Sequence, residues 1–145
     1  MNIMLTEVRS KLVPAMLFAL LVGISAAAQA KPEQLAQQSA DAWLALVDSG
    51  KYADSWQEAS SMFKAHVTKD QWRSMIAAVR DPFGKVLTRK LKSAKYATSL
   101  PGAPDGQYVV IQYESSFEHK QSAIETITPM LDGDGKWRVS GYYIK

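Results

Sequence analysis

Apolar residues recur every three or four positions from residue 34 onward, which is the spacing of amphipathic helices. The first apolar stripe ends at Ser49-Gly50, a pair typical of a helix C-terminus. The last stripe follows Thr68 and Gln71, whose spacing predicts a capping box, and it stops at Asp81-Pro82, where proline disfavours further helix. The pattern predicts helices over residues 34–49, 52–67 and 69–81.

After Gly84 the pattern changes to the alternation of apolar and polar residues that strands show. Turn-forming glycine and proline residues at 101–106 and 132–135 divide this half of the chain. We expect an antiparallel meander of four strands near residues 86–99, 107–117, 121–131 and 136–144. About three helices that cover one face of such a curved sheet form an α+β two-layer domain.

Turn geometry predicts the register of the last two hairpins. A tight turn at Gly133-Asp134 places Met130 opposite Trp137, and a turn at His119-Lys120 places Tyr113 opposite Thr126. In this register Glu125 faces solvent, but a slip of one residue would turn it inward. The face toward the helices then carries Val109, Ile111, Tyr113, Ser115, Phe117, Ile124, Thr126, Thr128, Met130, Trp137, Val139 and Tyr143.

Residues 1–30 have the pattern of a secretory signal peptide. Basic residues precede an apolar run over residues 12–28, and small residues at Ala28 and Ala30 form a cleavage site. We expect cleavage after Ala30, a single mature domain of residues 31–145, and a periplasmic or secreted location. An uncleaved anchor is the alternative, although the run is short for a bilayer span of about 20 residues.

Composition narrows the classes of partner. The chain has 17 basic and 14 acidic residues, and a net charge of +3 is too small to indicate nucleic acid. It has no cysteine, so it has no disulfide and no cysteine that could carry a lipid after cleavage. We therefore expect no stable membrane anchor on the mature chain.

Aromatic residues on the predicted helices and sheet favour a pocket for a small apolar ligand between the two layers. The alternative is that these large side chains fill the core. The candidate pocket residues are Trp43, Trp56, Trp72, Tyr113, Thr126, Trp137 and Tyr143.

Catalysis and metal binding find little support in the sequence. An isomerase or cyclase needs an inward carboxylate base, and only a shifted register would supply one, as Glu125. The Asp132–Gly135 segment lacks the later ligands of a calcium loop, and His66 and His119 have no partner at metal-ligand spacing. We expect no metal and no cofactor, with an isomerase-type enzyme as the alternative.

A second candidate surface is basic. Five cations gather at the start of the predicted sheet: Lys85, Arg89, Lys90, Lys92 and Lys95. They suit an anionic partner such as a lipid headgroup or an acidic glycan, or they protect an edge strand from pairing. The polar outer face of the sheet also suits a protein partner or a second copy of the chain, as in a homodimer.

Four stretches of the chain resemble the bacterial domain-of-unknown-function family 4019. They include Asp48-Ser49-Gly50-Lys51-Tyr52 and Pro101-Gly102-Ala103-Pro104-Asp105-Gly106, and they span residues 42–52, 55–56, 99–110 and 134–144. The order of helices and strands also resembles the cystatin-like, nuclear transport factor 2-like cone. The resemblance implies an exported protein with space between helices and sheet, and it assigns no catalytic residue. We expect a non-enzymatic module that binds a small ligand or a partner.

Overall fold

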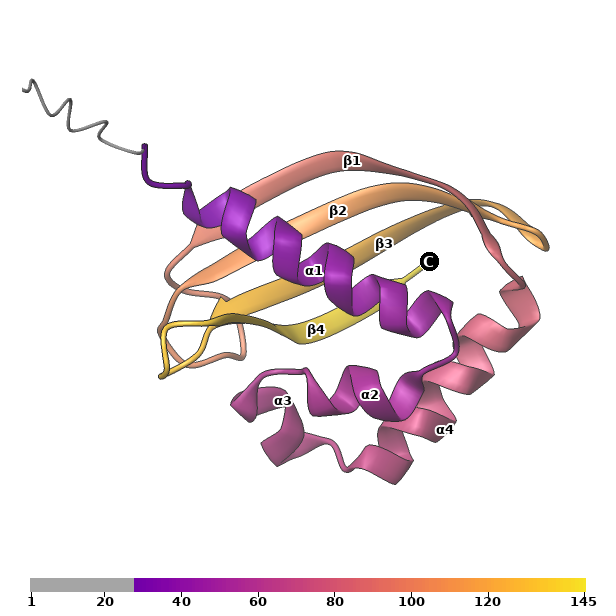
Figure 1. Cartoon of the computed structure of the whole chain (residues 1–145), viewed down its shortest axis with the longest axis horizontal. Helices are drawn as coiled ribbons and strands as arrows, with labels where there is room; N and C mark the ends of the chain where they lie inside the picture. The colour runs from indigo at the N-terminus through magenta and orange to yellow at the C-terminus, as the bar shows by residue number, and fades with distance from the viewer. Residues whose placement is uncertain (1–27) are drawn as a thin grey trace, which may run out of the picture.

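The computed structural model describes residues 28–145 as four α-helices and a four-stranded sheet (Figure 1). The elements are α1 (Pro32–Asp48), α2 (Tyr52–Gln57), α3 (Ser61–His66), α4 (Lys69–Arg80), a 3-10 turn η1 (Asp81–Phe83), β1 (Val86–Ala97), β2 (Tyr108–Phe117), β3 (Lys120–Leu131) and β4 (Trp137–Ile144). The apolar run of the predicted signal peptide lies almost entirely outside the described residues. Within residues 28–145, no helix is long and apolar enough to cross a membrane.

The predicted α+β architecture is confirmed. The strands form an antiparallel meander in the order β1-β2-β3-β4. Helix α1 lies along the sheet and contacts all four strands, whereas α2, α3 and α4 gather at the β4 side (Figure 1). The core forms where the apolar stripes of α1 and α4 meet the inner face of the sheet. Its buried members are Ala36, Ala40, Trp43, Leu44, Val47, Trp72, Ile76, Val109, Ile111, Tyr113, Ile127 and Val139.

The second predicted helix is in fact two short helices. The expectation of one helix over residues 52–67 is wrong because the chain breaks at Glu58 to Ser60. Ser60 is the N-cap of α3, and its hydroxyl accepts from the Phe63 N–H at 3.1 Å. Its own N–H donates to the Val139 carbonyl at 2.8 Å, so the break attaches the helices to β4. The capping box predicted at Thr68 is confirmed at the start of α4.

The predicted register is wrong by one residue on β3. The β2–β3 turn is Glu118-His119, one residue earlier than expected, which by itself would shift the pairing by two residues. An irregularity in the pairing between Ser115 and Phe117 reduces the shift to one residue, so Tyr113 pairs with Glu125 instead of Thr126. In the β3–β4 turn, the Asp132 N–H donates to the Lys136 carbonyl. The turn between them contains three residues instead of the expected two, and its last residue, Gly135, has φ +80°. That extra turn residue places Leu131, and not Met130, opposite Trp137.

This shift exchanges the faces of β3. Glu125 and Ile127 are completely buried beneath the helices, while Thr126 lies on the outer face. Irregular pairing between Thr128 and Pro129 extends the exchange into β4. As a result Tyr143, expected inside, lies on the outer face and is 62% exposed. The same correction applies to Ile124, Thr128 and Met130, which share the outer face.

Candidate functional site

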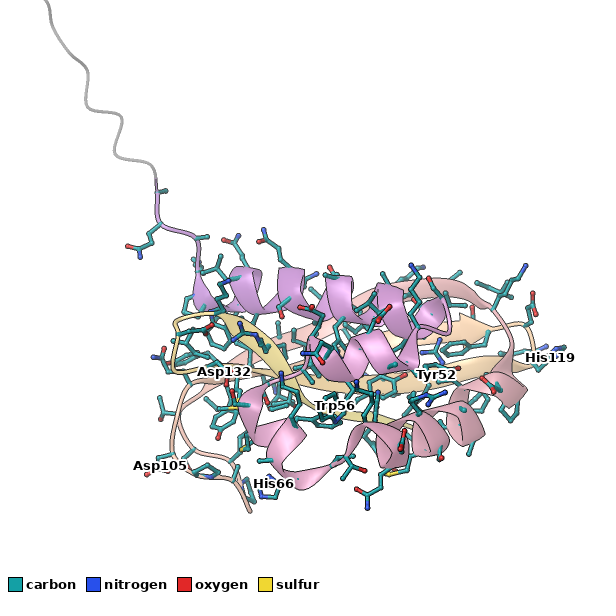
Figure 2. All side chains as sticks on the ribbon, turned by 60° about the horizontal axis from the view of Figure 1, so that its bottom comes forward. Tyr52, Trp56, His66, Asp105, His119 and Asp132 are labelled. Atoms are coloured by element: carbon teal, nitrogen blue, oxygen red, sulfur yellow. The ribbon has the colours of Figure 1, made fainter. Side chains whose placement is uncertain are left out.

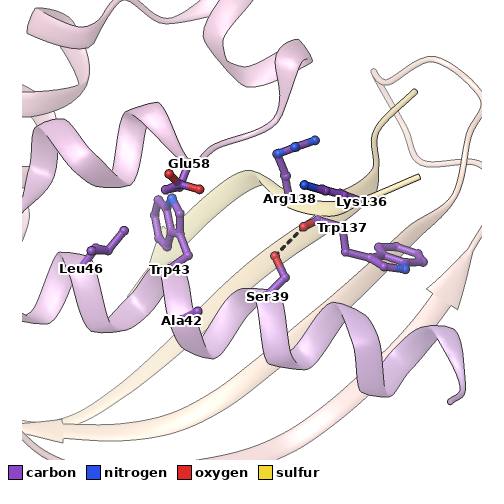
Figure 3. Close-up of a pocket in the computed structure, with 8 residues that line it drawn as sticks. All are labelled: Ser39, Ala42, Trp43, Leu46, Glu58, Lys136, Trp137 and Arg138. Atoms are coloured by element: carbon purple, nitrogen blue, oxygen red, sulfur yellow. Dashed lines mark hydrogen bonds between the residues drawn. The ribbon is translucent and has the colours of Figure 1, made fainter. Parts of the chain in front are cut away.

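A pocket of about 290 Å³ opens between α1, the end of α2 and the β3–β4 hairpin (Figure 3). Helix α1 supplies the floor, the C-cap residue of α2 supplies one wall, and β4 with its preceding turn supplies the other. The lining residues are Ser39, Ala42, Trp43, Leu46, Glu58, Lys136, Trp137 and Arg138.

Trp43 forms a rigid part of the floor. Its side chain faces the core because it continues the apolar stripe of α1, and its indole N–H donates to the Ser55 carbonyl at 2.8 Å. Its ring centroid lies 5.6 Å from that of Trp72 and 5.5 Å from that of Tyr142. The indole nitrogen is therefore already satisfied, and Trp43 offers a ligand only apolar contact.

A hydrogen bond joins α1 to β4. The Ser39 hydroxyl donates to the Trp137 carbonyl at 2.8 Å, a bond that Figure 3 shows at the mouth of the pocket. The Trp137 indole points away from Trp43 in the same view, so the backbone and the start of its side chain line the pocket. The bond thus joins the floor of the pocket to the wall that β4 supplies.

Charges of opposite sign occupy the two walls. Glu58 lies on one side, and Lys136 and Arg138 lie across the pocket from it (Figure 3). Arg138 donates two hydrogen bonds of 2.8 Å to Asp134 and one of 3.0 Å to Asp132. The hydrogen bonds from Arg138 lower the pKa of Asp134 to about 2.

The other predicted pocket residues lie elsewhere. Trp72 is 5% exposed in the core, and its indole N–H donates to the Ser55 hydroxyl at 2.9 Å. The Trp56 N–H donates to the Val67 carbonyl, and the Tyr113 hydroxyl donates to Asp41 beside another hollow. Thr126 and Tyr143 lie on the outer face. Of the predicted set, the structure brings only Trp43 and Trp137 to the pocket in Figure 3.

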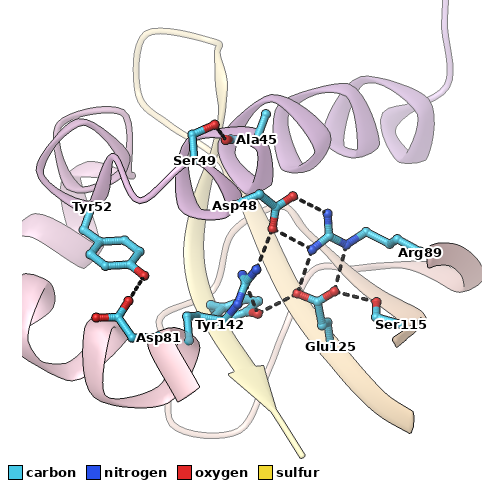
Figure 4. Close-up of polar contacts among 10 residues, drawn as sticks. Ala45, Asp48, Ser49, Tyr52, Asp81, Arg89, Ser115, Glu125 and Tyr142 are labelled. Atoms are coloured by element: carbon cyan, nitrogen blue, oxygen red, sulfur yellow. Dashed lines mark hydrogen bonds and ion pairs between the residues drawn. The ribbon is translucent and has the colours of Figure 1, made fainter. Parts of the chain in front are cut away.

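The sequence did not predict a buried ionic cluster, which we define as Asp48, Arg80, Arg89, Ser115, Glu125 and Tyr142 (Figure 4). Glu125 accepts from Arg89 Nε at 2.7 Å, from the Ser115 hydroxyl at 2.5 Å and from the Tyr142 hydroxyl at 2.5 Å. Asp48 then joins the two arginines, with contacts of 2.7 Å to each. Two arginines and two carboxylates balance the charge of the cluster.

The pKa shifts of Asp48, Arg89 and Tyr142 follow from their contacts in the cluster. Burial raises the pKa of Asp48, but hydrogen bonds from Arg89 and Arg80 outweigh burial and leave it below its usual value. Burial and the neighbouring Glu125 raise the pKa of Tyr142. Burial opposes the charge on Arg89, and hydrogen bonds to Asp48 and Glu125 outweigh it and raise that pKa.

We predict that Asp48 gives the protein an acid-sensitive share of its stability. Because its pKa is lower in the folded state, this share is present above about pH 4 and is lost as pH falls toward the folded pKa. Urea unfolding of wild type and Asp48→Asn should show a stability gap at pH 7 that narrows at pH 3. Asp105→Asn, in the exposed β1–β2 loop, should leave the pH dependence unchanged. An Asp48→Asn gap of equal size at both pH values would contradict the assignment.

Four of the five residues of the predicted basic patch lie together on the surface, and Arg89 does not. Arg89 points inward to the ionic cluster and is unavailable to an anionic partner. Lys85, Lys90, Lys92 and Lys95 are exposed at the edge of the sheet, and Lys92 lies 3.6 Å from Glu114. Because β1 is an edge strand, these lysines discourage pairing with another strand.

The histidines and the Asp132–Gly135 segment, for which the sequence indicates no metal site, lie in separate parts of the fold. His66 and His119 lie far apart in Figure 2, and residues 28–145 hold no group of three His, Asp or Glu side chains placed to bind a metal ion. Asp132 instead accepts from the Ser61 N–H at 3.2 Å and from Arg138, which ties α3 to the hairpin turn.

A family of related proteins matches most of the chain. The family model described as "Protein of unknown function (DUF4019)" matches residues 39–142, a segment that contains the whole pocket and the whole ionic cluster. No curated protein matches the sequence. The chain belongs to the DUF4019 family, as the resemblance in its sequence indicated.

Proposed function

We propose that this protein is an exported, non-enzymatic module that binds a small ligand in the pocket between α1 and β4. The observation that carries the proposal is a pocket with an apolar floor at Trp43 and unpaired charges on facing walls. Ligand pockets combine such apolar surfaces with a few polar groups that orient the ligand. The hydrogen bonds of Trp43 and Ser39 keep these walls in place.

The ionic cluster argues against the enzyme alternative. Glu125 is the inward carboxylate that an isomerase mechanism would use, yet it is completely buried and occupied by Arg89, Ser115 and Tyr142. Two hollows at the surface are lined in part by Asp48, and Glu125 lines neither of them. A general base must reach the proton that it removes, and Glu125 has no open side for a substrate.

Export rests on the N-terminal sequence pattern and is supported by where the fold begins. The Lys31 carbonyl accepts the first helical bonds of α1, and Pro32 opens the helix. A chain cleaved after Ala30 would therefore keep every helix and strand described for residues 28–145. The packing of helices on one face of an open meander also supports assignment to the cystatin-like cone.

A protein partner or second copy on the outer face of the sheet is the second candidate. No described helix covers that face, and Tyr143 is 62% exposed on it. Native mass spectrometry separates the two candidates, because a bare dimer would favour the outer face and a small adduct would favour the pocket.

We predict that protein isolated without denaturation from the cells that make it carries a small adduct in native mass spectrometry. Ala42→Trp should remove the adduct, because a large side chain on the floor fills the pocket. Ala45→Trp is the matched control on the same exposed side of α1, where it reaches a different hollow. Circular dichroism should show the same fold for both variants. An adduct that survives Ala42→Trp, or that only Ala45→Trp removes, would place the ligand outside this pocket.

A further inference from the structure

The walls of the pocket leave one carboxylate and one ammonium group without a partner. Glu58 is the C-cap residue of α2, and Lys136 lies in the β3–β4 turn on the opposite wall (Figure 3). Among the described residues, neither charged group makes a hydrogen bond or an ion pair. A ligand with a single charge would be attracted to one wall and repelled by the other.

Arg138 does not add a third free charge. Its guanidinium is bonded to both Asp132 and Asp134, so one positive charge faces two negative charges. Because these contacts already engage the guanidinium, the groups of the walls that remain free to bond a ligand are the Glu58 carboxylate and the Lys136 ammonium.

The floor between these charges is apolar. Ala42, Trp43 and Leu46 present hydrocarbon and ring surface, and the polar atom of Trp43 is bonded to Ser55. A volume of about 290 Å³ lies at the lower limit of ligand pockets, so it suits a molecule of one or two residues better than a lipid.

Resting on the small-ligand function above, we propose that the pocket binds a zwitterion with an apolar body, such as a short apolar peptide. The α-ammonium group of the peptide bonds to the Glu58 carboxylate, and its carboxylate bonds to the Lys136 ammonium. The apolar side chains of the peptide pack on Trp43 and Leu46. This assignment uses every free polar group of the two walls.

Calorimetric titration with three probes tests the assignment: leucyl-leucine, its N-acetyl form and its C-terminal amide. We expect each cap to weaken binding about tenfold, because it removes one charge-assisted bond. Glu58→Gln should weaken leucyl-leucine about tenfold and leave the N-acetyl form unaffected. Lys136→Met should weaken the binding of leucyl-leucine about tenfold and leave the binding of its C-terminal amide unaffected. Lys51→Met, an exposed lysine outside the pocket, should change nothing.

Four outcomes would overturn the assignment. Equal binding of all three probes would mean that only apolar contacts matter. Loss of affinity by Glu58→Gln for both leucyl-leucine and its N-acetyl form would separate Glu58 from the ammonium group. No binding of leucyl-leucine, together with a native adduct that Ala42→Trp removes, would reject the zwitterion and keep the small-ligand function. Absence of both the adduct and dipeptide binding would reject both proposals.

Discussion

Glu125→Gln is expected to lower the free energy of unfolding by about 3–5 kcal/mol, a large part of the stability of a domain of this size. The carboxylate is completely buried and accepts from Arg89, Ser115 and Tyr142. An amide keeps the shape of the side chain but removes its charge and points a donor at groups that are themselves donors. The positive charge of Arg89 would then lack half of its compensation inside the protein.

Urea unfolding at pH 7 measures this loss, and Glu114→Gln on the neighbouring strand is its control. Glu114 has a side chain that is 60% exposed and a contact of 3.6 Å with Lys92. Its substitution should therefore cost less than about 1 kcal/mol. A Glu125→Gln variant as stable as wild type would show that the cluster is not structural, and it would reopen the enzyme alternative.

Trp72→Ala is also expected to lower the free energy of unfolding by about 3–5 kcal/mol. The ring lies between Phe63, at 5.1 Å between centroids, and Trp43, at 5.6 Å. Its removal would leave a cavity and would also leave the Ser55 hydroxyl without its donor. Because Trp43 packs on the same ring, the floor of the pocket would lose its support, and ligand binding should weaken with stability.

Met75→Ala on the same helix is the control for Trp72, because Met75 is 57% exposed and its loss should change stability by no more than about 0.5 kcal/mol. Trp72→Phe should fall between the two variants, since it keeps aromatic packing and loses the hydrogen bond to Ser55. Equal stability of Trp72→Ala and Met75→Ala in urea would contradict the placement of Trp72 in the core.

Most of the helical half of the fold was predictable because the spacing of apolar residues and the capping residues indicate the same helices. The spacing of Trp43 and Val47 alone decides which side of α1 is buried, and Thr68 marks the start of α4. The break between α2 and α3 was not predictable, because the apolar residues Trp56, Ala59 and Phe63 stay at helical spacing across it. The chain breaks there because Ser60 bonds to β4, a contact between distant segments.

The register of β3 was missed for a physical reason. Ile124 and Ile127 are three residues apart and so fall on opposite faces of the strand, which makes both faces look suitable for burial. A lone glutamate is expected to face solvent because burial of an unpaired charge is costly. Its partner Arg89 lies 36 residues away in the chain, so only the folded sheet shows the compensation. The threonines at 126 and 128 were the available indication, since the shifted register sends their hydroxyls outward.

The pocket was predictable only in part. Trp43 and Trp137 followed from helical and strand periodicity, whereas Glu58 and Lys136 lie in turns whose positions depend on how the helices meet the hairpin. Neither turn residue belongs to a motif that would have distinguished it from an ordinary surface charge.

The most direct test of the small-ligand pocket compares two-dimensional NMR spectra of one sample before and after its ligand is removed. Protein isolated natively is recorded, unfolded in urea, dialysed, refolded and recorded again. If a ligand occupies the pocket, the amide signals of Ser39, Ala42 and Trp137 should differ in position between the two spectra. The indole N–H of Trp56, which is bonded to Val67 outside the pocket, should keep its position. Identical spectra, or shifts confined to residues outside the pocket, would contradict the account.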